Sequence, residues 1–153
     1  MQHLSAQFGE NIEAELGALN TPANLDLRVN LLRGDCARAL ELLAQEGIIA
    51  EPTLLSPMGL RIKTRVNLHT TTAFKGGFVE PQDEASQIAA LLCAARAEQL
   101  TIDFCAGAGG KTLALAASMK DGGPLIACDT EPNRLRRIKP RLKRAGVSNV
   151  TVK

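Results

Sequence analysis

Residues 101–112 read Thr-Ile-Asp-Phe-Cys-Ala-Gly-Ala-Gly-Gly-Lys-Thr, and the rest of the chain is arranged around them. The apolar Ile102, Phe104 and Cys105 favour a buried strand. The glycines after them permit positive φ and let the backbone approach a ligand closely. The alanines and leucines of residues 113–119 favour a helix, whose N-terminal N–H groups would face the turn. The stretch therefore predicts a strand, a glycine-rich turn and a helix that together bind a ligand with an anionic group.

Three known glycine-rich binding motifs are candidates for this stretch. A phosphate-binding P-loop requires a glycine five positions before Gly110, where this chain has Cys105. A dinucleotide fingerprint that starts at Gly107 requires its third glycine where Thr112 stands. The remaining candidate is the first motif of a Rossmann-like S-adenosylmethionine (AdoMet) methyltransferase, with Asp103 as the acidic residue of its first strand. A tight turn without any ligand is the simpler alternative.

The composition predicts one modest core or two small ones, because 45% of the 153 residues are hydrophobic. The chain has no long uncharged apolar run and no export signal, so we expect a soluble, cytoplasmic protein without a membrane partner. Its cysteines never form a Cys-x-x-Cys pair, and this spacing predicts neither a metal site nor a disulfide framework. We expect reduced, buried packing residues at Cys36, Cys93, Cys105 and Cys128.

The formal net charge of +2 conceals an asymmetry between the two halves. Residues 1–72 hold six basic and eight acidic side chains, whereas residues 73–153 hold twelve basic and eight acidic ones. Seven of these twelve lie within residues 134–144, with no acidic residue among them. The pattern favours contact with a polyanion through a helix over residues 132–146, in which Pro140 is expected to cause a kink. A solvated helix face is the alternative.

The first half of the chain predicts a small α+β domain over residues 1–72. A helix over residues 4–19 is expected to pack on the elements after it, and residues 25–32 alternate as a strand. A second helix is expected over residues 34–47, and short strands are expected at 54–55 and 59–66. If this domain contacts a nucleic acid, the candidates are Arg28, Arg33, Arg61, Lys63 and Arg65. A positioning domain with solvated charges is the alternative.

The second half, residues 73–153, predicts strands and helices in alternation. A polar, flexible connector at residues 70–77 is expected to mark the domain boundary. The first helix spans residues 82–99, with an inner stripe at Ala85, Ile88, Ala89, Leu92 and Ala95. A buried strand at residues 124–128 ends in Asp129, where a carboxylate can accept from both ribose hydroxyls of a nucleoside. A cap for the next helix is the alternative role of Asp129. Residues 149–153 begin a third strand.

Two segments carry a resemblance to a known family. Asp103–Thr112 resembles the Asp-x-Cys-Ala-x-x-Gly-Gly-Lys-Thr signature of the Sun/NSUN-type RNA (cytosine-5) methyltransferases. Residues 76–86, Gly-Gly-Phe-Val-Glu-Pro-Gln-Asp-Glu-Ala-Ser, are similar to a second motif of that family but carry Glu80-Pro81 before Gln82 in place of a single Val. Weaker resemblance extends from about Leu27 to the C-terminus, so the match is to the N-terminal portion of the family.

The resemblance implies an α/β fold: a small α+β (ferredoxin-like) domain, then the first half of a Rossmann-like AdoMet methyltransferase domain. It implies formation of 5-methylcytosine in rRNA or tRNA, with Gln82 and Ser86 near the methionine end of the cofactor. The cofactor-binding candidates are Cys105, Ala106, Gly107, Ala108, Gly109, Gly110, Lys111, Asp129 and Arg134. The RNA-binding candidates are Arg136, Arg137, Lys139, Arg141, Lys143 and Arg144.

The family's reaction uses two cysteines, one in a Pro-Cys and one in a Thr-Cys-Ser motif. Neither motif occurs in residues 1–153, so we expect no catalytic residue here and no methyl transfer by this chain alone. We also expect the first strand of the second sheet to lack a neighbour on one side and to favour self-association. The alternative function is a non-catalytic RNA-binding or assembly module that retains an AdoMet-type cradle.

Overall fold

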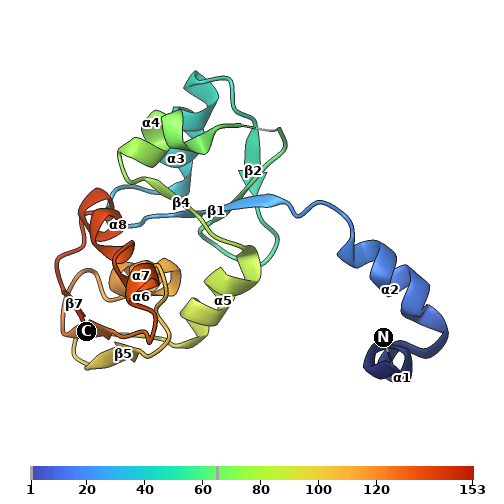
Figure 1. Cartoon of the computed structure of the whole chain (residues 1–153). Coiled ribbons are helices and arrows are strands. Elements are labelled where there is room, and N and C mark those ends of the chain that lie inside the picture. Colours follow the sequence, from blue (N-terminus) through green and yellow to red (C-terminus); the bar gives the residue numbers. More distant parts are fainter. Residues whose placement is uncertain (1, 65) are drawn as a thin grey trace.

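The computed structural model describes residues 2–64 and 66–153, and these form two sheets, one in each half of the chain (Figure 1). The first sheet has the strand order β2-β3-β1-β4, and all its neighbouring strands are antiparallel. Its strands are β1 (Leu25–Val29), β2 (Ala50–Pro52), β3 (Gly59–Ile62) and β4 (Val79–Pro81).

Helix α3 (Cys36–Gln45) and the short helix α4 (Thr72–Lys75) contribute to the core on one face of this sheet. Helix α3 begins where the Asp35 carboxylate accepts a hydrogen bond from the Arg38 amide at 2.8 Å. Leu27 and Val29 of β1 point into this core beside Leu43 of α3. The small α+β domain predicted from the sequence is therefore present.

The opposite face of the first sheet is lined by charged side chains. Because residues alternate along a strand, Asp26 and Arg28 face away from the Leu27 core. Arg28 lies opposite Glu80 of β4, and both side chains are buried. Helix α5 (Glu84–Leu92) packs on this face, where the Gln87 amide donates to the Leu27 carbonyl at 3.2 Å. Polar groups therefore connect the first sheet to the second half of the chain.

The second sheet is parallel, with the order β5-β6-β7. Its strands are β5 (Thr101–Asp103), β6 (Leu125–Ala127) and β7 (Val150–Val152). Parallel strands require crossover connections, here α6 (Gly110–Ser118) between β5 and β6, and α7 (Pro132–Leu135) with α8 (Ile138–Ala145) between β6 and β7. Leu113 of α6 and Ile138 of α8 meet in the core over Ala127. This is the first half of a Rossmann-like arrangement.

The N-terminal helical segment does not pack as expected. It consists of α1 (Gln2–Phe8), a 3-10 turn η1 (Gly9–Asn11) and α2 (Ile12–Leu19). Neither η1 nor α2 has a buried residue, and Figure 1 shows the segment extending away from the rest of the molecule. The helix prediction is right but the predicted packing is wrong, because helical spacing of apolar residues does not specify the surface that they contact.

Two other predictions in the first half are wrong. The strand predicted at Leu54 and Leu55 is absent, because both residues are exposed in the loop before β3. The strand that pairs with β3 is β2, which begins four residues earlier. The expected connector over residues 70–77 is ordered structure, in which η2 (Leu68–Thr70) leads into α4. Phe74 of α4 is buried in the first core. The apolar ring of Phe74 packs in this core, a burial that the polar residues around it in the chain did not indicate.

Helix α5 is shorter than expected and buries a different stripe. It begins after Asp83, whose carboxylate accepts from the Ala85 amide at 2.9 Å, and it ends at Leu92. Gln87 and Ala90 are the buried residues of this helix, whereas Leu92 is 79% exposed. Gln87 is buried because its amide is fully occupied, accepting from the Ser56 hydroxyl at 2.7 Å and donating to two carbonyls.

The expected domain division after residue 72 remains a prediction. Strand β4 lies beyond that position in the chain, yet it pairs with β1 of the first sheet. Only Gln82 and Asp83 separate β4 from α5. The connection between the two halves is therefore part of the first sheet.

Candidate functional site

The glycine-rich turn follows β5 and adopts a conformation that requires glycine. Gly107 and Gly109 have φ values of 55° and 86°, which side chains of L-residues rarely allow. A Cβ on Gly107 would lie 2.6 Å from a guanidinium nitrogen of Arg134. A Cβ on Gly109 would lie 2.3 Å from Cγ1 of Ile138. The turn therefore packs closely against α7 and α8, and this close packing requires glycine at positions 107 and 109.

The ends of this turn are tied together by a side-chain hydrogen bond. The Thr112 hydroxyl donates to Oδ2 of Asp103 at 2.7 Å. Thr112 is fully buried in the first turn of α6. Asp103 therefore stabilises the strand-to-helix transition, and this contact accounts for an acidic residue at the end of β5.

Asp129 connects the turn to the end of the neighbouring strand β6. Its Oδ2 accepts from the Gly107 amide at 2.7 Å, and its Oδ1 accepts from the Glu131 amide at 2.9 Å. These two backbone donors, first Glu131 and then Gly107, together with the charge of Arg134, lower the pKa of the Asp129 carboxyl below its usual range. The carboxylate is therefore held ionised beside the turn, with lone pairs left for further donors. Its bond to the Glu131 amide orients the residue before α7, but the start of that helix has no side-chain capping bond.

A hollow of about 300 Å³ lies at this end of the second sheet. Its walls come from the residues after β5 and β6 and from α7, namely Phe104, Cys105, Cys128, Asp129, Thr130 and Arg134. One guanidinium nitrogen of Arg134 is 4.0 Å from Oδ2 of Asp129. The hollow thus has an apolar wall at Phe104 and a charged wall at Asp129 and Arg134, a combination that suits a nucleoside with a polar substituent.

Most of the predicted cofactor residues lie together at this hollow or in the turn beneath it. Cys105, Asp129 and Arg134 line the hollow, and Ala106, Gly107, Ala108, Gly109 and Gly110 form the turn. Lys111 is exposed at the start of α6 and does not line the hollow. Gln82 lies beside Gly110, because a Cβ on Gly110 would be 3.7 Å from its Nε2. Ser86 is half-buried in α5.

The cysteines are not the buried packing residues that the sequence suggested. Cys93 and Cys105 are exposed, and Cys36 and Cys128 are half-buried. Cys105 lies after β5, in the turn, and neighbouring Phe104 is 79% exposed. The prediction of a buried strand at Ile102, Phe104 and Cys105 is wrong, because all three are exposed: β5 stops at Asp103, and among the described residues no strand pairs with its other edge.

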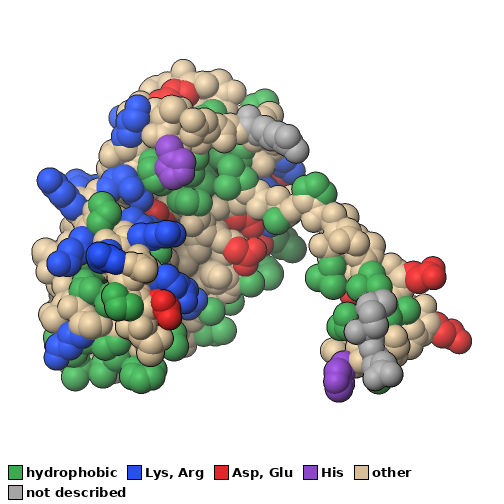
Figure 2. Space-filling view, viewed as in Figure 1, with side chains coloured by type: hydrophobic (Ala, Val, Ile, Leu, Met, Phe, Trp, Pro, Cys, Tyr) green, Lys and Arg blue, Asp and Glu red, His purple; other side chains and the backbone are tan. Residues whose placement is uncertain are grey.

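The basic segment after β6 forms two short helices in place of one kinked helix. Helices α7 and α8 are separated at Arg136 and Arg137, and Pro140 lies in the first turn of α8, where a missing N–H is tolerated. Four of the predicted RNA contacts are exposed, namely Arg136, Arg137, Lys139 and Lys143. Figure 2 shows Lys and Arg side chains gathered on this side of the molecule.

Arg141 and Arg144 are engaged within the protein. Both guanidinium groups pair with Glu80 of β4, with Arg141 at 3.0 Å. Arg141 also donates to the Ala108 carbonyl at 2.7 Å. Arg144 lies over the ring of Phe74, 4.0 Å from its centroid. Sequence reasoning missed Glu80 and its role, although a lone carboxylate before the proline of a short strand was a visible signal.

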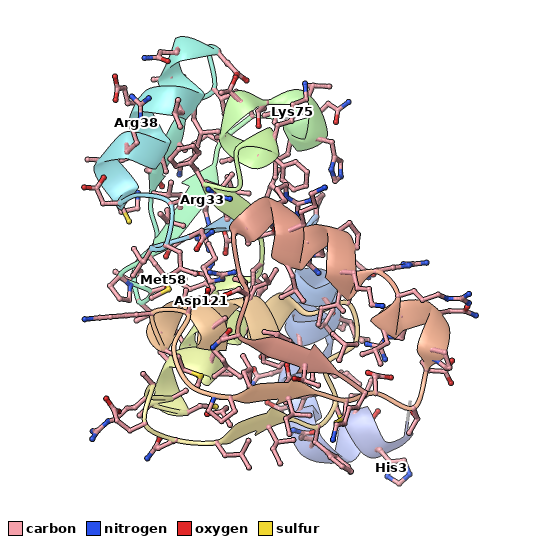
Figure 3. All side chains as sticks on the ribbon, turned by 90° about the vertical axis from the view of Figure 1, so that its left-hand side faces the viewer. His3, Arg33, Arg38, Met58, Lys75 and Asp121 are labelled. Carbon is pink, nitrogen blue, oxygen red and sulfur yellow. The ribbon has the colours of Figure 1, made fainter. Side chains whose placement is uncertain are left out.

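The candidate cations of the first half are also largely engaged. Arg28 is buried and donates to Oε1 of Gln82 at 2.7 Å. Arg61 makes two hydrogen bonds to Asp26, and Lys63 pairs with Glu51. Arg33 contacts the Arg144 carbonyl at 3.4 Å, at the junction of the two halves (Figure 3). Arg65 lies outside the described residues.

Comparisons with known proteins agree with this architecture. The family model for the "Methyltr_RsmF/B-like, ferredoxin-like domain" matches residues 1–69, and that for "16S rRNA methyltransferase RsmB/F" matches residues 90–153. The chain is 31% identical over 147 residues to the probable ribosomal RNA small subunit methyltransferase B of Coxiella burnetii, covering 96% of this chain and 34% of the relative. It is 37% identical over 150 residues to the methyltransferase B of Xylella fastidiosa strain Temecula1, covering 95% and 34%.

Solved structures show the same fold. A methyltransferase homolog from Pyrococcus horikoshii is 26% identical, with a TM-score of 0.87, and the match covers 95% of this chain and 48% of that one. NSun6 from Pyrococcus horikoshii with SFG is 18% identical, with a TM-score of 0.91 over 99% of this chain and 63% of that one. The chain spans about a third of the length of the Coxiella and Xylella methyltransferases.

Two further findings concern the described residues. None of their helices is long and apolar enough to span a bilayer. They also contain no cluster of three or more His, Cys, Asp or Glu side chains that could hold a metal ion.

Proposed function

The chain belongs to the RsmB/F (Sun) family of RNA methyltransferases, and we propose that it provides the AdoMet-binding turn of an enzyme that forms 5-methylcytosine in ribosomal RNA. The relatives carry the name ribosomal RNA small subunit methyltransferase B, and ribosomal RNA is therefore the substrate that we favour over transfer RNA. A cytoplasmic location belongs to the same proposal.

The observation that carries this proposal is the bridge from Asp129 to the Gly107 amide. It holds a carboxylate at the end of the strand that follows the glycine turn, where a ribose can donate both hydroxyls. Arg134, beside Asp129 on the charged wall of the hollow, is placed to attract a ligand carboxylate. AdoMet would supply the methyl group when bound. The chain's own residues would bind and orient it, with the backbone of the turn in contact and Phe104 as the apolar wall.

No residue of this chain is assigned a catalytic role in the proposal. Cys105 is exposed at the hollow, yet no Pro-Cys or Thr-Cys-Ser motif occurs in residues 1–153. We therefore assign the cysteine chemistry of the reaction to family motifs outside these residues. RNA contact is assigned to the exposed cations of α8 and of the segment between α7 and α8.

Calorimetry with S-adenosylhomocysteine tests the site. We expect Asp129→Asn to weaken binding by about tenfold or more, because an NH2 donor replaces one of the two acceptor oxygens and cannot accept from a ribose hydroxyl. Asp121→Asn is the matched control, since the Asp121 carboxylate also accepts from two backbone amides, Ser148 and Asn149, but lies between α6 and β6 and does not line the hollow. Equal affinity in the wild type and in Asp129→Asn would remove Asp129 from the site.

A further inference from the structure

Arg141 joins the glycine turn to the first sheet. One end of its guanidinium group donates to the Ala108 carbonyl at 2.7 Å, and the other end pairs with Oε2 of Glu80 at 3.0 Å. Ala108 lies between Gly107 and Gly109 at the centre of the turn, whereas Glu80 belongs to β4. A single planar side chain therefore contacts both halves of the molecule.

Glu80 is a fixed anchor for this contact. Its strand pairs with β1, its side chain is 2% exposed, and it also accepts from Arg144. Arg28, directly opposite on β1, is so deeply buried that desolvation lowers its pKa to about 10, while Glu80 acts in the opposite direction. The Glu80 carboxylate thus neutralises several guanidinium groups at once, and such a buried charge is costly to move.

The turn has few other contacts that set the direction of the Ala108 carbonyl. The Gly109 amide donates to Ala106 at 2.8 Å, and the Gly107 amide donates to Asp129 on the other side. The Gly109 amide and the Ala108 carbonyl belong to one planar peptide, so the bond to Ala106 and the bond from Arg141 hold that peptide from its two sides. Arg141 is the side-chain donor to the Ala108 carbonyl among the described residues.

We propose that Arg141 is a positioning residue that holds the Ala108 carbonyl and, through Glu80, makes the shape of the cofactor turn depend on docking of the first domain. The effect of Arg141 on cofactor binding rests on the proposed function. Its role in coupling the glycine turn to the first domain does not. By linkage, a ligand that binds the turn would also tighten the contact between the two halves.

Arg141→Lys tests the proposal, because one ammonium group cannot span both partners as the guanidinium fork does. Arg144→Lys is the matched control: it alters a second partner of Glu80 but makes no contact with Ala108. Glu80→Gln removes the anchor charge. Two measurements apply to each variant, namely amide hydrogen exchange across residues 106–113 without ligand and the affinity for S-adenosylhomocysteine.

We expect Arg141→Lys and Glu80→Gln to accelerate exchange at Gly109 and Leu113 by about tenfold, and to weaken ligand binding by a similar factor. Arg144→Lys should change neither by more than about twofold, even if its melting temperature falls. The double variant of Glu80 and Arg141 should be no worse than either single one, because both remove the same link. Unchanged exchange in Arg141→Lys would overturn the inference. Absence of ligand binding in the wild type would instead contradict the proposed function. The amide hydrogen exchange rates would still test whether Arg141 couples the turn to the first domain.

Discussion

The hydroxyl of Thr112 donates to the carboxylate of Asp103 across 2.7 Å, so the first helix turn of α6 is hydrogen-bonded to the last residue of β5. Eight residues, including all the glycines of the turn, lie between these two partners. The bond limits how far the turn can open without a ligand. It also makes Thr112 a residue of the scaffold, buried and out of reach of the hollow.

Replacing Thr112 by Val should lower the free energy of unfolding by about 1 kcal/mol, because the shape is kept while the Asp103 carboxylate loses a donor. Urea unfolding followed by circular dichroism measures this change. Ser118→Ala in the same helix is the control, since Ser118 is an exposed residue whose hydroxyl donates to the Ala114 carbonyl at 3.1 Å. Equal losses in the two variants would show that the Asp103 contact contributes nothing special.

RNA binding should depend steeply on salt through the exposed cations of α8 and of the segment between α7 and α8. Changing Arg136, Arg137, Lys139 and Lys143 together to Ala should reduce the slope of log affinity against log salt by about 3, the number expected for four phosphate contacts. Filter binding to a small-subunit rRNA fragment at several salt concentrations measures the slope. The control changes four exposed cations elsewhere, namely Arg38, Arg96, Lys120 and Lys153. Equal slopes for both quadruple variants would show that Arg136, Arg137, Lys139 and Lys143 do not contact RNA and form only a solvated surface.

Glu84 should make stability depend on pH. Its carboxylate accepts from the Ser56 and Leu55 amides, and these bonds lower its pKa below the ordinary value of 4.5. A lowered folded-state pKa stabilises the protein above the unfolded-state pKa, and this contribution is lost as the pH falls through the folded value. The stability difference between the wild type and Glu84→Gln should therefore be largest near pH 7 and shrink below about pH 4.5. Urea unfolding of the wild type and of Glu84→Gln at several pH values measures this difference.

The edge at β5 should favour self-association. In the described sheet β5 pairs only with β6, and the apolar Leu92, Leu100, Ile102 and Phe104 are exposed around it. An unpaired apolar edge is a template for pairing with another chain. Light scattering should show a mass that rises with concentration, and Ile102→Lys should suppress the rise. Ile49→Lys, at another exposed apolar site, should leave it unchanged.

Local sequence patterns predicted the glycine turn, the parallel strands and the α+β domain correctly. Strand β1 shows why: its period-two alternation sets which side chains face the core, so Leu27 and Val29 could be placed inward. Helix α5 shows the limit. Its apolar stripe at Leu92 is exposed and its polar Gln87 is buried, because hydrogen-bond partners sixty residues away in sequence decide that burial.

In the candidate site, too, local sequence predicted some residues and tertiary contacts decided others. Gly107 and Asp129 could be placed from sequence, because a turn and a strand end fix their surroundings locally. The pairing of Glu80 with Arg141 could not, since it joins residues that are 61 positions apart and belong to different halves of the chain. A run of cations was visible in the sequence, but which of them are neutralised within the fold depends on tertiary structure.

Strand β4 has a consequence for recombination of this molecule with its relatives. A gene fusion that exchanged the first 72 residues would keep β4 from one parent and β1 from the other. The exchanged sheet would then have to match Arg28 with a foreign partner at position 80 across the ladder. A crossover after Pro81 keeps the ladder from one parent and moves the mismatch to the Glu80–Arg141 pair. No crossover near this junction leaves both contacts within one parent, so the two halves should be inherited together.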